Sequence, residues 1–139
     1  RANGQPVTPT AIRLVLDGDE IVFRAEDVLI TADGSHVFRR VSTGRMRSKA
    51  DNDVAAAALL MAAQQHGPQT RVELVHLSDT EVTPLAMTPK VLGNRRQTLS
   101  DYLSAIRAGA FKAAPSERTC PGCPAFFICG PVSPGVLEI

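Results

Sequence analysis

The chain has 139 residues, of which 44% are hydrophobic, and its 15 Lys and Arg residues against 14 Asp and Glu residues give a net charge of +1. This length and apolar content predict one folded domain, and the balanced charge excludes the strongly basic and strongly acidic classes of binding protein. The sequence contains no apolar run near the roughly 18 residues of a membrane helix and no signal peptide, so we expect a cytoplasmic protein that does not bind membranes.

The first ten residues, RANGQPVTPT, are rich in Pro, Gly, Asn and Thr and poor in apolar side chains. This composition is typical of a linker between domains. We therefore interpret residues 1–10 as a linker and expect the chain to be a piece of a longer protein.

Two Asp-Gly pairs divide the next part of the chain into alternating apolar and polar runs. Asp17-Gly18 predicts a hairpin between strands near 11–16 and 20–31. Asp33-Gly34 predicts an antiparallel pairing of the second strand with a third near 36–42. Together they predict a three-stranded meander.

The stretch SKADNDVAAAALLMAAQQHG is the clearest helix signal. Ser48 or Asp51 is the expected N-cap, and Gly67 the expected end. Its apolar stripe is expected to contain Val54, Ala58 and Met61.

The remaining elements are a strand over 70–78, an edge strand in 81–88 and a helix from Pro89 to about Gly109. Pro84 favours an edge position because proline has no N–H to donate to a neighbouring strand. The helix is expected to present Leu99, Leu103 and Ile106 on one face. Three strands, a helix, one or two strands and a helix predict an α/β protein, more narrowly an α+β fold with a mixed sheet.

Two longer stretches, FRAEDVLITADGSHVFRRVSTGR and IRAGAFKAAPSERTCPGCPAFFICG, carry a resemblance to a known family. They resemble the C-terminal RecB/AddB-like nuclease domain, of the PD-(D/E)XK superfamily, found in ATP-dependent DNA helicases of the UvrD/Rep family. The resemblance implies a restriction-endonuclease-like core over 11–115 and a cysteine-containing tail over 116–139. Because the sequence has no phosphate-binding loop of the G-x-x-x-x-G-K-[ST] type, ATP and its Mg²⁺ would bind a helicase part outside this sequence.

The residues that the resemblance assigns to the nuclease site depart from an active pattern. Asp27, with Glu26 beside it, matches the first metal-binding acid, but Arg40 stands in place of the second acid and Ser42 in place of the catalytic Lys. A guanidinium cannot bind Mg²⁺ and would repel it. We therefore expect a degenerate, non-catalytic site; the alternative is an active Mg²⁺-dependent exonuclease whose site has migrated to Glu20, Glu26 or Asp27.

A run of cations between Ser35 and Ala50 contains no acidic residue. Such a cluster is suited to gripping DNA phosphates, although these side chains could instead pair with nearby carboxylates or face solvent. The predicted DNA-binding residues are Arg39, Arg40, Arg45, Arg47 and Lys49.

The three cysteines, Cys120, Cys123 and Cys129, all lie in the tail. An odd number in an expected cytoplasmic protein argues against disulfides. The resemblance implies a 4Fe-4S cluster whose fourth ligand lies outside this chain. Zinc and reduced structural cysteines are the alternatives.

The histidines His36, His66 and His76 occur in no metal-binding spacing, and we interpret them as structural. Taken together, the sequence predicts a non-catalytic domain that assists DNA binding or docks onto helicase domains of the same protein. A purely structural interaction module is the remaining alternative.

Overall fold

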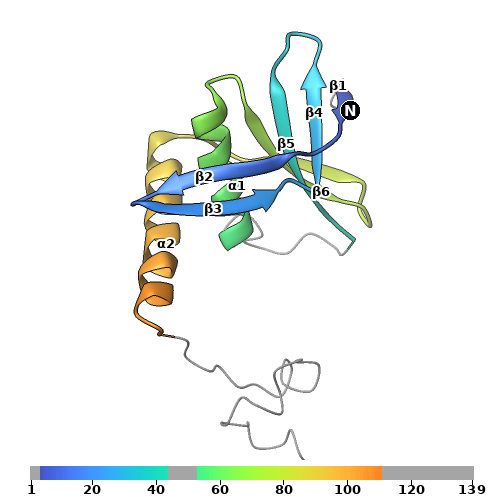
Figure 1. Cartoon of the computed structure of the whole chain (residues 1–139). Coiled ribbons are helices and arrows are strands. Elements are labelled where there is room, and N and C mark those ends of the chain that lie inside the picture. The colour runs from blue at the N-terminus through green and yellow to red at the C-terminus, as the bar shows by residue number, and fades with distance from the viewer. Residues whose placement is uncertain (1–3, 44–52, 111–139) are drawn as a thin grey trace, which may run out of the picture. The chain divides into compact units, whose positions relative to one another are not determined.

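The computed structural model of the chain describes residues 4–43 and 53–110 (Figure 1). Its described elements form a five-stranded mixed sheet, a separate two-stranded hairpin and two helices, which confirms the predicted α+β class. In chain order they are β1 (Gly4–Val7), β2 (Ala11–Leu16), β3 (Asp19–Arg24), β4 (Asp27–Thr31), β5 (His36–Ser42), α1 (Val54–His66), β6 (Arg71–His76), β7 (Glu81–Pro84) and α2 (Pro89–Arg107).

The five-stranded sheet has the order β1-β4-β5-β6-β7. Strands β5 and β6 are parallel, and the chain passes through α1 between them. The other neighbours pair antiparallel. Both outer strands contain a proline, Pro6 in β1 and Pro84 in β7, so the predicted edge position of the 81–88 segment is confirmed.

Strands β2 and β3 form the predicted hairpin around Asp17-Gly18. Both turn residues have positive φ, 51° for Asp17 and 86° for Gly18, which is the backbone that a tight two-residue hairpin requires. The second prediction, that β4 and β5 pair antiparallel across Asp33-Gly34, is also confirmed.

The predicted three-stranded meander is wrong, because the segment expected as one strand over 20–31 forms two strands in different sheets. The break falls at Ala25 and Glu26, between β3 and β4. Ala25 is buried in the same apolar cluster as Val28 and Phe38. Its small side chain lets the chain turn into the core and leave the hairpin for the larger sheet.

Residues 4–7, expected to be part of an irregular linker, form β1 and pair with β4. A side chain at Gly4 would come within 3.0 Å of the Leu29 Cβ and 3.1 Å of the Ile30 carbonyl oxygen. Gly4 therefore allows the close approach of the two strands. The composition that suggested a linker is explained here by a strand at the sheet edge.

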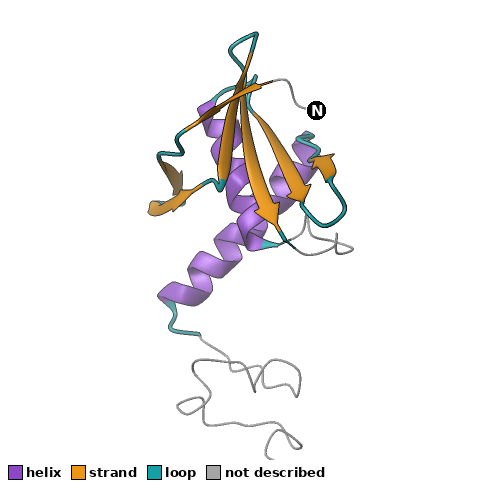
Figure 2. Ribbon diagram, turned by 90° about the vertical axis from the view of Figure 1, so that its right-hand side faces the viewer, coloured by secondary structure: helices purple, strands orange, loops and turns teal. Residues whose placement is uncertain are grey.

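Helix α1 packs between the five-stranded sheet and the hairpin. Figure 1 shows the hairpin crossing α1, and Figure 2 shows the larger sheet beside it. Leu59 and Leu60 join Phe38 of the sheet in one cluster, whereas Ala58 and Met61 join Leu14 of the hairpin in a second. Every residue from 56 to 63 is consequently buried.

Two details of the predicted helix are wrong. The N-cap is Asp53, whose carboxylate accepts a hydrogen bond of 2.8 Å from the Ala56 N–H; the expected caps Ser48 and Asp51 lie outside the described residues. Val54, expected on the apolar stripe, is 47% exposed. Because the sheet covers one side of α1 and the hairpin covers another, its apolar residues need not lie on a single stripe.

Helix α2 begins at the predicted Pro89. Leu99 is buried and Leu103 packs partly against the same cluster, but Ile106 is 56% exposed, so the predicted apolar face is only partly confirmed. Neither described helix is long and apolar enough to cross a membrane.

Candidate functional site

Arg39 of β5 lies in a row of charged side chains that crosses three neighbouring strands. The strand register places Asp27 of β4 on one side of it and Glu73 of β6 on the other. The Arg39 guanidinium contacts the Asp27 Oδ2 at 3.5 Å and the Glu73 Oε2 at 3.0 Å. The side chain of Arg39 is only 15% exposed, so its charge is balanced by these two carboxylates more than by solvent.

Arg40 and Ser42 lie on the opposite face of β5, since successive residues of a strand point to opposite faces. Arg40 forms an ion pair with Asp53, the residue that caps α1. The Ser42 hydroxyl lies 2.8 Å from the His76 Nδ1. His76 is buried, and its Nε2 has no hydrogen-bond partner among the described residues.

The three residues of the expected degenerate site therefore do not form one cluster. Asp27 is on the Arg39 face of the sheet, away from Arg40 and Ser42. The neighbouring Glu26 accepts a hydrogen bond from the Val41 N–H, just beyond the last described β4–β5 pair. This carboxylate satisfies a backbone donor that the end of β4 leaves without a strand partner.

The carboxylates proposed for a migrated site are also dispersed. Glu20 belongs to the hairpin, where it lies 2.6 Å from the guanidinium of Arg13. Within residues 4–43 and 53–110 no group of three or more His, Cys, Asp or Glu side chains could hold a metal ion. The remaining predicted residues, Arg45, Arg47, Lys49, Cys120, Cys123 and Cys129, lie outside the described part of the chain.

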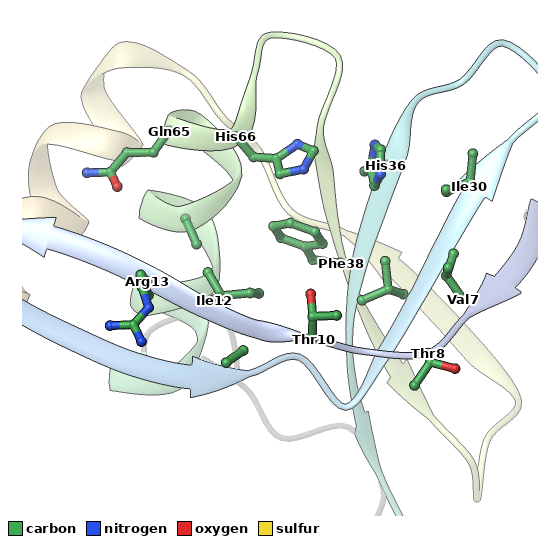
Figure 3. A pocket seen from close by; sticks show the side chains of 13 residues that line it. Val7, Thr8, Thr10, Ile12, Arg13, Ile30, His36, Phe38, Gln65 and His66 are labelled. Atoms are coloured by element: carbon green, nitrogen blue, oxygen red, sulfur yellow. The ribbon is translucent and has the colours of Figure 1, made fainter.

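A cavity of about 480 Å³ opens at the other end of β5 (Figure 3). Its walls come from the β1–β2 connection, the start of β2, strands β4 and β5, and the last turns of α1. The lining residues are Val7, Thr8, Thr10, Ala11, Ile12, Arg13, Val28, Ile30, His36, Phe38, Ala62, Gln65 and His66. In the view of Figure 3, the imidazoles of His36 and His66 lie on one side of the Phe38 ring and Thr10 lies on the other.

The two histidines of the cavity are in direct contact. Their ring centroids are 4.4 Å apart, and the His66 ring also meets the edge of Phe38 at 5.4 Å. The His66 Nδ1 lies 2.9 Å from the hydroxyl of the buried Thr70, which fixes the orientation of the ring. Burial, and in addition repulsion from His36, lowers the pKa of His66 below its ordinary value.

The sequence did not indicate this cavity. His36 and His66 are 30 positions apart and only the crossover through α1 brings them together. The available signals were the place of His36 at the start of a predicted strand and of His66 at the end of a predicted helix, and neither specifies a contact.

Comparisons with known proteins bear on the fold. The chain matches no protein family profile and no curated protein sequence. Among solved structures it is similar to the crystal structure of SSO0001, with a TM-score of 0.52 and 12% sequence identity over 90% of this chain. The match spans 60% of the length of that chain. At this level of identity the similarity concerns the fold alone.

Proposed function

We propose that the chain is a nuclease-like domain that does not cut DNA, and that it assists DNA binding or domain docking in an ATP-dependent helicase of the UvrD/Rep type. The proposal begins from the resemblance in FRAEDVLITADGSHVFRRVSTGR and in the cysteine tail. The helicase activity belongs to a part of the protein outside this sequence.

The observation that carries the non-catalytic part is the pairing of Arg40 with Asp53. The resemblance requires a metal-binding carboxylate at position 40, and this chain instead has a cation there that already holds a neighbouring carboxylate. Ser42, in place of the Lys, is bonded to His76. These pairs use the polar groups on that face for internal contacts, which supports the loss of metal binding.

The same contacts reduce the number of residues that we propose to bind DNA. Arg39 and Arg40 are ion-paired within the domain, so we assign phosphate contact to Arg45, Arg47 and Lys49. The cysteine tail is proposed to hold a 4Fe-4S cluster with a ligand from elsewhere in the longer protein, and zinc is the second choice.

Cleavage assays test the first part. We expect no cutting of single- or double-stranded DNA with Mg²⁺ or Mn²⁺, and no change in the Asp27→Ala and Glu26→Ala variants. Metal-dependent cleavage that either substitution abolishes would overturn the proposal and favour a migrated site. The double variant Arg40→Asp, Ser42→Lys places a second carboxylate beside Asp53, and Mn²⁺ titration measures whether that face then binds a metal ion.

Salt-dependent DNA binding tests the second part. Replacing Arg45, Arg47 and Lys49 with Ala should reduce the slope of log affinity against log salt by up to about three units. The control replaces three cations outside this segment, Arg13, Arg71 and Lys90, and should leave the slope near that of the wild type. If the first triple variant also leaves the slope unchanged, the segment does not contact phosphate and a docking module is the better reading.

A further inference from the structure

The cavity beside His36 and His66 combines an apolar floor with a polar rim. Val28, Phe38 and Ala62 on its floor are buried parts of the main core cluster. Hydroxyl, amide and imidazole groups also line the cavity, and they belong to Thr8, Thr10, His36, Gln65 and His66. The amide nitrogen of Gln65 donates a hydrogen bond to the Val15 carbonyl. About 480 Å³ lies within the usual range for small-molecule sites.

The charge of the lining favours a negative ligand. No Asp or Glu lines the cavity, whereas Arg13 and the two histidines do. The Arg13 guanidinium is paired with Glu20 at the rim, so its charge is partly neutralised. The imidazoles are therefore the principal groups that gain positive charge as the pH falls.

The geometry of the two imidazoles distinguishes an anion from a metal ion. With their centroids 4.4 Å apart, the two rings disfavour carrying positive charge together, and a negative group beside both would remove that repulsion. A zinc site needs three or four protein ligands, and the described residues provide no third His, Cys, Asp or Glu here.

We propose that this cavity binds a small organic carboxylate with an apolar, ring-sized body. The apolar body of the ligand lies on Phe38, Val28 and Ala62, and its carboxylate accepts hydrogen bonds from His36 and His66. Thr10 lies on the other side of the Phe38 ring from the two histidines. The site is independent of the proposed DNA contact, because it uses none of the cations assigned to phosphate.

Binding is coupled to protonation of the imidazoles. The lowered pKa of His66 means that the ring is mostly neutral in the empty protein near pH 7, and a bound carboxylate raises that pKa again. The other charged groups at the cavity are His36 on β5 and Arg13 on β2, the latter with Glu20 on β3. Affinity should therefore fall as the pH rises through the pKa of His66 in the complex.

NMR titration of the full chain with three probes tests the proposal. Benzoate is the probe for the complete ligand, benzyl alcohol keeps the ring without the charge, and acetate keeps the charge without the ring. We expect benzoate to shift the imidazole signals of His36 and His66 with saturation, about fivefold or more tighter at pH 6 than at pH 8. Benzyl alcohol and acetate should each bind at least about fivefold more weakly than benzoate at pH 6.

Variants and a direct contact measurement make the result decisive. Thr10→Phe, which fills the mouth, should abolish benzoate binding, whereas Val22→Phe on the exposed face of the hairpin should not. The His36→Gln, His66→Gln variant should bind weakly and without pH dependence. In the wild type, benzoate ring protons should show NOEs to Phe38 and to the Ala62 methyl. Absence of these NOEs at saturation, equal affinity for benzyl alcohol, or unsaturable shifts spread over the surface would each overturn the proposal.

Discussion

The two ends of β5 use polar side chains in opposite ways. At the C-terminal end, Arg39, Arg40 and Ser42 are each bonded to a residue of a neighbouring element. At the N-terminal end, His36 contacts another imidazole, and both rings line an open cavity. Both ends belong to β5 and lie beside α1. The difference between them therefore comes from the residues that their polar side chains contact.

This contrast shows that a polar residue can bind a ligand readily only where its polar atoms are not already used by internal partners. A charged or hydroxylic group that already has an internal partner must give up that partner to bind anything else, at a cost comparable to the bond lost. At the cavity, the bond from His66 to Thr70 uses only Nδ1, so the other ring nitrogen can bind a ligand without breaking that bond. The resemblance directed attention to the first end of β5, whereas the geometry favours ligand binding at the second.

The largest expected effect comes from breaking the charged row at the first end. Arg39→Met leaves Asp27 and the largely buried Glu73 without their cation, and we expect the free energy of unfolding to fall by about 3 kcal/mol. Urea denaturation of the variant and the wild type measures the change.

Two controls separate this effect from the loss of a side chain. Arg39→Met combined with Glu73→Met should recover much of the lost stability, because it removes the buried carboxylate as well. Arg13→Met breaks an exposed pair and should cost much less, because solvent screens such pairs. If Arg39→Met is as mild as Arg13→Met, the row does not stabilise the sheet.

A smaller effect is expected at Asp53, which both caps α1 and pairs with Arg40. Asp53→Ala should lower the free energy of unfolding by about 1–2 kcal/mol. Asp53→Asn keeps the cap and loses only the ion pair, so it should retain most of the stability. Equal losses in the two variants, measured by urea denaturation, would show that the ion pair rather than the cap is important.

The smallest expected effect is a pH dependence at the second end. The folded pKa of His66 is below the ordinary value of about 6.5, so the unfolded chain takes up a proton first as the pH falls. The contribution to stability is therefore complete above about pH 7 and is lost as the pH falls from there toward the folded pKa.

Denaturation at pH 7.5 and pH 5.5 measures this loss, and His66→Gln should reduce it. His36→Gln removes the second cause of the shift and should move the pKa of His66 back toward its ordinary value in an NMR titration. A pKa for His66 at or above the ordinary value in the wild type would contradict the combined effect of burial and repulsion from His36.

Much of the fold could be predicted because local signals were strong. Asp17-Gly18 specified a hairpin whose turn residues indeed have positive φ, and Pro89 marked the start of α2. The break at Ala25 was not predictable by the same reasoning, because side-chain alternation continues up to it and only the packing of α1 between two sheets separates the strands. The prediction of a linker around Gly4 was wrong for a similar reason. Gly4 allows β1 to lie close to β4, and no local pattern reveals that contact.

The candidate sites were less predictable than the fold. The sequence identified Arg40 and Ser42 as departures from a nuclease pattern, but their partners Asp53 and His76 depend on the register of β5 with β6 and on the start of α1. The cavity depends on residues from both ends of the crossover. Contacts of this kind are set by tertiary packing, which a single sequence does not encode locally.

The prolines of the two outer strands have a consequence for the behaviour of the protein in concentrated solution. An outer strand normally offers a row of backbone N–H groups onto which a strand of another molecule can add. Pro6 in β1 and Pro84 in β7 each remove one donor from that row at the two borders of the five-stranded sheet. Each proline therefore makes its border of the sheet a poorer template for the addition of a strand from another molecule.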